Sequence, residues 1–593
     1  MKLLMSPKKD SHYRLNGCET IELSDYKVQF IPPTEKSLAC KAYSDSVSHY
    51  LFFGSLYEKS DNPARYIASV YMAKGPEALF DIDGDYVFIV IDPDSITVVS
   101  DREGLIPLYY RLFNREIVIT TECYSFFDDY CESDIDYSSV YDFLRYGTLV
   151  GNHTFSNKVQ LIQGGTVFRF RDGKISTDRV HFFFHDSSKE QKNIKALSEE
   201  IIFNYGKALE KRIDREPEKV AVLLSGGMDS RFVLSTANRF IKDGRLSCVI
   251  FGQNHSREVE VAKETAGLKG NRYFSYLLKP DDFLRDISEY LRISCGGDMF
   301  PQSFIISVAK KARADGITGF ITGTDIETQI GGTFLPESAL FFKGKLSKYI
   351  TDNTKSVKMH LLGEEDLKLF CRPGVYDKLF SCRSNLHEMA KQYDDIPVRD
   401  SIQTFVQENR EKRVVLVREI VPGCYLDYIN PNFDIDFLNS AARIPAEWRL
   451  NRRLYRQLFV DYYPDYAKIT YNNTNLPVSA PLELWKEGAS LEYHRELLFE
   501  KMEFEAQRNG NPIVFYPHYY SDFDGWSRFD LGWQKTIQMT ITDSESFLFS
   551  RILRRDVIEK LLREHRIGSS NNRRLLVYLV SLEMFFKMAL KRE

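Results

Sequence analysis

The sequence has no long hydrophobic run: no stretch approaches the roughly eighteen consecutive apolar residues that a membrane-spanning helix needs. Residues 1–10 also lack the apolar centre of a signal peptide. The nine cysteines form no C-x-x-C pair and no zinc-binding spacing, and their odd number excludes a fully paired disulfide framework. We therefore expect a soluble, cytoplasmic protein with free thiols and no membrane partner.

Basic residues are not in excess either. Lys and Arg number 79 against 83 Asp and Glu, a formal net charge of −4, so the composition does not predict a nucleic-acid partner. The Walker loop, Gly-x-x-x-x-Gly-Lys-Ser/Thr, is absent, which excludes that class of nucleotide site. The 593 residues are 43% hydrophobic, an ordinary globular composition, and this length predicts about two to four domains.

A different pattern for phosphate binding is present at residues 221–230. An apolar run ends in Leu224, then Ser225-Gly226-Gly227-Met228-Asp229-Ser230 follows, and a helix-compatible stretch comes next. We interpret this as a buried strand, a tight turn and a helix N-terminus, whose free N–H groups favour an anion. Asp229 suits an anion site only if Mg²⁺ lies between its carboxylate and the phosphates. The alternative is an ordinary glycine-rich turn.

This hexapeptide after an apolar strand resembles the pyrophosphate loop of the ATP-pyrophosphatase families, which cleave ATP to AMP and pyrophosphate. A second resemblance lies at residues 84–122, where "GDYVF", "SDREGLIPLYY" and "TE" occur in this order. It is similar to the amino-terminal glutaminase domain of asparagine synthetases, which has "GDFAF", "ARDxxGxxPLYY" and "SE". The two resemblances together imply an asparagine synthetase-like protein, related also to β-lactam synthetases and lasso-peptide cyclases.

The resemblance also implies what is missing from the amino-terminal domain. The family's glutaminase uses an N-terminal cysteine whose own amine is the base, but position 2 here is Lys2, and Cys18 and Cys40 are internal. The family's glutamine-binding Asn-Gly-Glu turn aligns with Phe53-Gly54-Ser55. We therefore expect a domain that keeps its fold and has lost glutamine hydrolysis. The alternative is removal of a longer leader that exposes a nucleophile.

A third motif, "TGTDIETQIGG" at residues 322–332, aligns without gaps with the family loop "SGEGADELFGG". Glu327 takes the place of the family's Mg²⁺-binding aspartate. Thr324 replaces a residue that takes part in catalysis, a glutamate in asparagine synthetases and a tyrosine in β-lactam synthetases. Asp325, one residue further on, is the candidate replacement carboxylate. The alternative for Asp325 and Glu327 is a solvated loop.

Residues 401–420 read as one helix, on which Glu408 is a candidate acid–base residue. The alternative is an i,i+4 surface pair of Glu408 with Lys412. The lysine that the family places after its "LP" turn aligns with Asn472, and Lys468 is its neighbour. Arg452 or Arg453 falls where the family has a lysine that contacts ATP.

The resemblance thus implies ATP and Mg²⁺ as cofactors. The implied site comprises the catalytic candidates Glu408, Asp325 and Lys468, the nucleotide-binding residues Leu224, Ser225, Gly226, Gly227, Asp229, Ser230, Phe251, Gly323 and Arg453, and the metal ligands Asp229 and Glu327.

The implied fold is an N-terminal nucleophile-hydrolase-like α+β sandwich over residues 1–190, of glutamine amidotransferase type. An α/β parallel-sheet ATP-pyrophosphatase domain, of the adenine nucleotide α-hydrolase type, would follow over residues 191–593. The hydrophobic periodicity of the sequence agrees with both domains. Short runs of alternating apolar and polar residues come first, and strands at 219–224, 246–251 and 316–322, separated by helical stretches, follow. Residues 336–400 read as an insertion, and residues 551–593 as two amphipathic helices of a C-terminal extension.

The implied activity is that of an amide ligase, which adenylates a carboxylate with ATP and transfers the acyl group to ammonia or to an amine on a substrate. Asparagine synthesis from ammonia, a non-catalytic ATP-binding or scaffold protein, and a thiolating enzyme are the alternatives. The sequence does not identify the acyl substrate, which is a small molecule or a peptide, or the amine. It leaves the oligomeric state open, with a homodimer as one option.

Overall fold

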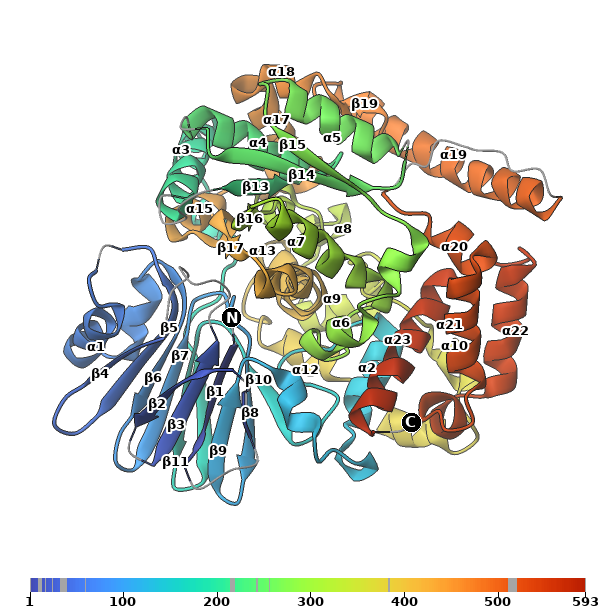
Figure 1. Ribbon diagram of the computed structural model, residues 1–593. Helices are drawn as coiled ribbons and strands as arrows, with labels where there is room; N and C mark the ends of the chain where they lie inside the picture. Colours follow the sequence, from blue (N-terminus) through green and yellow to red (C-terminus); the bar gives the residue numbers. More distant parts are fainter. Residues whose placement is uncertain are drawn as a thin grey trace.

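The computed structural model describes residues 2–8, 13–15, 17–23, 25–31, 40–58, 60–213, 219–241, 244–254, 256–381, 384–509 and 520–591. Its N-terminal part is a sandwich of two antiparallel sheets, at the lower left of Figure 1. A five-stranded parallel sheet with helices lies above it, and a group of C-terminal helices lies to the right. The expected succession of an antiparallel sandwich and a parallel α/β sheet is confirmed.

The sandwich contains two six-stranded sheets. The first has the order β10 (Val159–Ile162), β8 (Leu108–Phe113), β9 (Glu116–Thr120), β1 (Lys2–Pro7), β3 (Tyr26–Ile31) and β2 (Glu19–Leu23). The second has the order β12 (Lys174–Arg179), β11 (Thr166–Arg171), β7 (Ser95–Ser100), β6 (Gly84–Ile91), β5 (His49–Leu56) and β4 (Lys41–Ser44).

Strand β5 shows why the sheets stack. Side chains alternate along a strand, so Leu51 and Phe53 enter the core between the two sheets. Tyr50 and Phe52 point to the other face, where they pack with residues of α1 (Pro63–Lys74). Both faces of this strand are therefore buried, and the second sheet carries a helix on its outer side.

The parallel sheet has the order β15 (Tyr273–Leu277), β14 (Leu246–Gly252), β13 (Val220–Leu223), β16 (Gly319–Ile321) and β17 (Asp427–Ile429). The three strands predicted from the sequence are present, the third shorter than expected. The main helices around the sheet are α3 (Ile194–Ile213), α4 (Met228–Phe240), α5 (Arg257–Gly267) and α7 (Phe304–Ala314). Since β13 is central and buried on both faces, its run of apolar residues is what a parallel sheet requires.

The C-terminal helices α22 (Arg555–Arg566) and α23 (Arg573–Ala589) correspond to the predicted helical extension. Helix α23 is buried along most of its length and packs on the sandwich part of the chain. The Phe585 ring lies 5.3 Å from the Phe127 ring and 5.4 Å from the Phe155 ring, between centroids. The Tyr124 hydroxyl donates to the Met588 carbonyl oxygen at 3.0 Å. The extension thus holds the two parts of the chain together.

The expectation of free thiols throughout is corrected at one position. Cys123 and Cys295 form a disulfide between the sandwich part and the parallel-sheet part. Six other cysteines carry free thiols, and Cys382 lies outside the described residues. The two partners are 172 positions apart, a pairing that no short spacing could have indicated.

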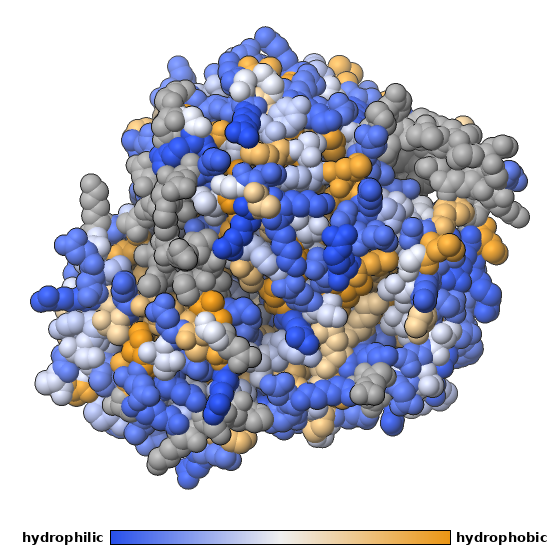
Figure 2. Space-filling model, in the orientation of Figure 1, coloured by the Kyte–Doolittle hydropathy of each residue, from blue (hydrophilic) through white to orange (hydrophobic). Residues whose placement is uncertain are grey.

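The face of the molecule in Figure 2 is hydrophilic over most of its coloured area, with hydrophobic residues in groups between hydrophilic ones. In the part of the chain that the structure describes, no helix is both long enough and apolar enough to cross a membrane.

Candidate active site

The loop after β13 lies at the carboxyl end of the central strand, where ligands of parallel sheets bind. Helix α4 begins directly after it, and no side chain among the described residues caps the first N–H groups of this helix. The Ser225 N–H donates to Ser230 Oγ at 3.0 Å, which ties the two ends of the loop together. A Cβ on Gly226 would lie 3.2 Å from Glu258 Cα, so glycine permits the close approach of α5. The predicted strand–turn–helix is confirmed, and its free N–H groups suit an anion.

Arg231 holds this loop in place through hydrogen bonds to backbone carbonyl oxygens. Its side chain is fully buried and donates to the carbonyl oxygens of Ile469 at 2.9 Å and Thr470 at 2.8 Å. A further bond reaches the Gly226 carbonyl oxygen at 3.4 Å. Burial lowers the pKa of Arg231 to about 10, which still leaves it charged at neutral pH. The loop is therefore held against a segment more than two hundred positions away.

Asp229 and Glu327, the two predicted metal ligands, lie together. The Tyr455 hydroxyl donates to Asp229 Oδ1 at 2.9 Å, and the Arg452 guanidinium pairs with Glu327. Burial, and then the neighbouring Glu327 carboxylate, raises the pKa of Asp229 well above its usual range. Gly323 makes the approach possible, because a Cβ there would collide with the backbone of Asp229.

These residues fit a Mg²⁺–polyphosphate complex. Buried Asp229 and partly buried Glu327 repel each other, so a divalent cation between them would be stabilising, and oxygen ligands are those that Mg²⁺ prefers. Among the described residues, no group of three or more His, Cys, Asp or Glu could hold a metal ion by itself. Mg²⁺ commonly takes one or two carboxylates and completes its shell with phosphate oxygens and water. Asp229 and Glu327 would supply the carboxylates, and the α4 N-terminus would hold the phosphates.

Asp325 is an unusual residue in this cluster. Its backbone has φ of 70°, in the left-handed region that favours glycine, and the aligned family loop has a glycine here. The side chain is only 6% exposed, and neither carboxylate oxygen has a hydrogen-bond partner among the described residues. Burial, and then the Glu411 carboxylate, raises the pKa of Asp325 well above its usual range. A strained backbone and an unpaired buried carboxyl group both cost folding free energy, and such positions are often functional. The catalytic role of Asp325 stays a prediction.

A carboxylate that the sequence did not indicate lies beside Thr324. The Thr324 hydroxyl donates to Glu419, which lies on α14 (Val417–Ile420). Burial raises the pKa of Glu419 to about 7. A carboxylate of near-neutral pKa is well suited to accept a proton at physiological pH. Glu419 is thus a candidate acid–base group at the loop position where threonine replaces the family's catalytic side chain.

Glu408 forms the i,i+4 pair with Lys412 that was the alternative to an acid–base role, but the pair is buried and does not lie on the surface. It lies in η8 (Gln407–Val415), and both of its oxygens are paired, one with Lys412 at 2.7 Å and the other with Arg179 of the sandwich at 2.7 Å. Lys412 also pairs with Glu103 of the sandwich at 2.8 Å. Burial pushes the pKa of Glu408 up, but Arg179 and Lys412 bring it below its usual value. Glu408 is therefore a fixed anion in a buried network between the two parts of the chain, with no oxygen free to accept a proton.

This placement predicts a structural effect for Glu408→Gln. Removing one charge from a buried network costs about 3 kcal/mol, because the remaining charges stay buried without compensation. The free energy of unfolding, measured by urea denaturation, should fall by that amount. Glu260→Gln is the matched control, because the Glu260–Lys263 pair is exposed and should contribute less than about 1 kcal/mol. Loss of activity in Glu408→Gln with unchanged stability would instead support the acid–base role.

Three further predicted residues have clear positions. Lys468 lies on the surface with its side chain 76% exposed, 3.8 Å from Asp465, so it takes no part in the buried cluster. Arg453 is exposed and its guanidinium lies over the Trp448 ring at 4.1 Å. Phe251, at the carboxyl end of β14, is half-buried and forms part of an apolar wall there.

Arg452, Tyr455, Glu411 and Glu419 belong to the cluster and were not assigned from the sequence. Arg452 could have been found, because its alignment was as good as that of Arg453. The side chains of the two arginines point in different directions. Arg452 has φ of 59°, and its guanidinium pairs with Glu327. No sequence pattern indicates Glu411 or Glu419, because both depend on how the helix at 398–420 is wound.

Comparisons with known proteins agree with this architecture. Residues 56–182 match the profile of the glutamine amidotransferase domain, and residues 206–325 match that of asparagine synthase. Both parts of the chain thus match profiles that are found in the asparagine synthase family, in the same order. A relative, asparagine synthetase [glutamine-hydrolyzing] 1 of Bacillus subtilis, is 24% identical over 267 residues. The match covers 42% of this chain and 41% of the relative, so less than half of the curated protein is matched.

Two solved structures of amidotransferases were also matched. One is the glutamine phosphoribosylpyrophosphate amidotransferase from B. subtilis complexed with ADP and GMP, at 9% identity and a TM-score of 0.21. The other is described as the allosteric regulatory enzyme of purine biosynthesis, at 10% identity and a TM-score of 0.20. Each covers 43% of this chain, and the chain covers 77% and 76% of them. These overlaps are too loose to bear on the function of this chain.

Proposed function

We propose that the chain is an AMP-forming amide ligase that does not hydrolyse glutamine. A substrate carboxylate attacks the α-phosphorus of ATP, and pyrophosphate leaves. An amine then attacks the acyl carbon, the C–N bond forms, and AMP departs with the electrons of the broken C–O bond. The observation that carries this proposal is the meeting of Asp229 and Glu327 beside the uncapped N-terminus of α4.

Each step of the proposed reaction can be assisted by a residue near Asp229 and Glu327. Backbone N–H groups of the loop at Ser225–Ser230 would hold the departing pyrophosphate. Mg²⁺, when bound, neutralises the charge that develops on the leaving group. Arg452 pairs with Glu327 and lies close enough to Asp229 to contribute positive charge at the same place. The Thr324–Glu419 pair would take a proton from the attacking amine.

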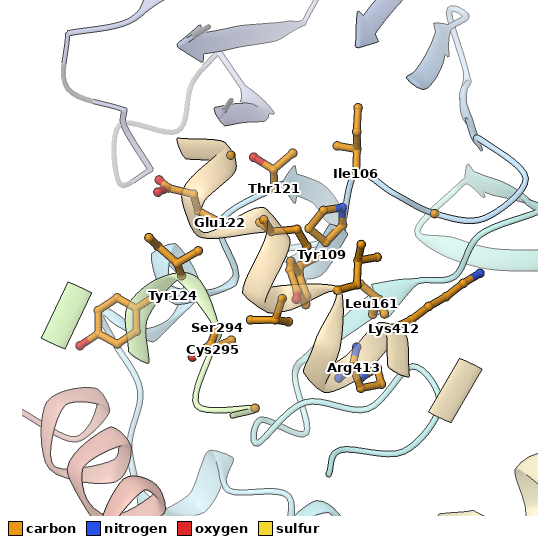
Figure 3. A pocket seen from close by; sticks show the side chains of 18 of the residues that line it. Ile106, Tyr109, Thr121, Glu122, Tyr124, Leu161, Ser294, Cys295, Lys412 and Arg413 are labelled. Carbon is orange, nitrogen blue, oxygen red and sulfur yellow. The ribbon is translucent and has the colours of Figure 1, made fainter. Parts of the chain in front are cut away.

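The absence of glutamine hydrolysis is part of the proposal. In the sandwich, Lys2 lies at the start of β1 and pairs with Glu122 at 2.5 Å. A cavity of about 1250 Å³ lies between the sandwich and the parallel-sheet part (Figure 3), and among the described residues that line it neither Cys18 nor Cys40 is found. Burial raises the pKa of the Cys40 thiol, which disfavours the reactive thiolate. These features support a sandwich that serves as structure and not as a source of ammonia.

The test is release of AMP and pyrophosphate from ATP–Mg²⁺ by the purified protein, with a panel of amino-acid and peptide carboxylates. We expect release that depends on one carboxylate, proceeds with ammonia or an amine, and is not supported by glutamine. Glutamate production from glutamine, measured in the same reactions, should stay at background. ATP binding without release for any acid would favour the scaffold alternative, and no ATP binding would refute the proposal.

A further inference from the structure

The turn at residues 354–359 presents a lysine beside the candidate active site. The Met359 N–H donates to the Thr354 carbonyl oxygen at 2.9 Å, which closes the turn. Val357 and Met359 are fully buried and anchor the turn to the body of the protein. Lys358, between them, is exposed. The segment predicted as an insertion therefore fixes the backbone of one lysine and leaves its side chain accessible.

The backbone of Lys358 has a conformation that lysine rarely adopts. Its φ is 60°, in the left-handed region, where the Cβ lies too close to the following carbonyl oxygen. Glycine or asparagine would adopt this conformation at a lower cost. Unfavourable backbone conformations persist where the surrounding structure imposes them, and they are frequent at positions that bind ligands. The side chain of Lys358 is therefore a candidate for ligand binding.

Lys358 lies beside the carboxylate that would hold Mg²⁺. Its Nζ is 5.5 Å from the centroid of the Phe334 ring, and the Arg410 guanidinium is 5.7 Å from the same centroid. Partial burial of the amino group lowers the pKa of Lys358, the Glu327 carboxylate raises it, and the Arg452 and Arg410 guanidiniums lower it. These charges act on Lys358 because they lie close to it. Three cationic side chains from three separate segments thus meet near Glu327.

Lys358 carries a charge with which no carboxylate of the described residues forms an ion pair. Arg410 pairs with Glu411, and Arg452 pairs with Glu327, but the Lys358 ammonium contacts only an aromatic ring in this group. Glu327 would also be engaged by Mg²⁺, which adds positive charge at the same place. Neighbouring cations repel one another, and an anion bound among them removes that repulsion. The group is therefore suited to an oxyanion ligand.

We propose that Lys358, together with Arg410, binds the terminal phosphates of ATP and the pyrophosphate that is released from it. Mg²⁺ on Glu327 would lie on phosphate oxygens, and the N-terminus of α4 would hold the same polyphosphate. The anion within reach of Lys358 is therefore a phosphate oxygen of this polyphosphate. An ammonium group binds phosphate as a point charge with three N–H donors. The inference rests on the proposed function, which supplies the ATP.

The test measures binding of pyrophosphate, ATP and AMP to the whole protein by isothermal titration calorimetry at saturating Mg²⁺. Lys358→Asn removes the charge, and asparagine tolerates the left-handed backbone. We expect this variant to bind pyrophosphate and ATP about tenfold more weakly and AMP, which lacks the terminal phosphates, within about twofold of wild type. Lys358→Arg keeps the charge and should restore most of the pyrophosphate affinity. Lys348→Gln, at an exposed lysine of α9 (Leu346–Asn353) in the same segment, is the control and should bind like wild type.

The outcomes separate this inference from the proposed function. Unchanged pyrophosphate binding in folded Lys358→Asn would overturn the role of Lys358 and leave the ligase proposal standing. Equal weakening of pyrophosphate and AMP binding would also overturn it, because a general disturbance of the site would then explain both. Lys358→Gly, which is unstrained at this φ, decides if circular dichroism shows that Lys358→Asn does not fold. Pyrophosphate binding that depends on Lys358, without AMP release from ATP for any acid, would support the phosphate site and refute only the ligase.

Discussion

Asp229→Asn is expected to lower pyrophosphate release from ATP by about a thousandfold, which corresponds to about 4 kcal/mol of lost transition-state stabilisation. The substitution removes one of the two carboxylates that would hold Mg²⁺ and leaves Glu327 paired with Arg452. The rate should be measured with saturating carboxylate substrate and increasing Mg²⁺. A higher Mg²⁺ requirement should accompany the lower rate.

The same variant should not be less stable. Asp229 is buried next to Glu327, and its raised pKa means that its ionised form destabilises the fold at neutral pH. An amide removes that repulsion, so the free energy of unfolding should stay the same or rise, as is common when a functional charge is removed. Asp465→Asn, at an exposed residue paired with Lys269, is the control. Pyrophosphate release within about threefold of wild type in Asp229→Asn would remove the basis for the ATP site.

Glu419→Gln is expected to lower amide formation by about a hundredfold to ten-thousandfold, the range for loss of a general base. Pyrophosphate formation should change little, because the proposed role of Glu419 is on the amine and not on ATP. Quenched-flow measurement of both products separates the two steps. Glu388→Gln, at an exposed glutamate paired with Lys391, is the control.

The pH dependence gives a second measure of this role. A base must be ionised to act, and the pKa of Glu419 is about 7. Amide formation at limiting amine should therefore rise by about tenfold per pH unit below this value and level off above it, once the amine's own titration is corrected for. Glu419→Gln should lose this dependence. An unchanged profile in the variant would assign the titration to another group.

The architecture could be predicted because its signals are local. The strand, turn and helix at 220–240 follow from an apolar run, two glycines and a helix-compatible stretch, and the structure places them as expected. Asp229 and Glu327 could be paired in advance because parallel strands β13 and β16 end at the same edge of the sheet. The disulfide between Cys123 and Cys295 could not be predicted, because it depends on how the two parts of the chain dock.

Glu419, the proposed acid–base residue, was not predictable because the helix at 398–420 is not a regular α-helix. It contains the π-helical segment η8, in which the Leu416 N–H donates to the Glu411 carbonyl oxygen, five positions earlier. Each such turn rotates the following residues away from the i,i+4 pattern. Glu408 before the segment therefore faces Lys412 and the sandwich, whereas Glu419 after it faces Thr324. Spacing rules locate a helix well, but they assign its faces only where the winding is regular.

Helix α23 also bears on how the chain is made. Phe585 covers Phe127 and Phe155, and the hydrogen bond from Tyr124 to Met588 joins positions 464 residues apart. During translation the sandwich emerges from the ribosome first, but this aromatic surface stays bare until α23 has been synthesised. The nascent chain therefore exposes this apolar patch throughout most of its synthesis, and exposed apolar surface of this kind favours aggregation. A ribosome stalled before α23 would release a product prone to aggregation, even though every residue of the ATP site had already been translated.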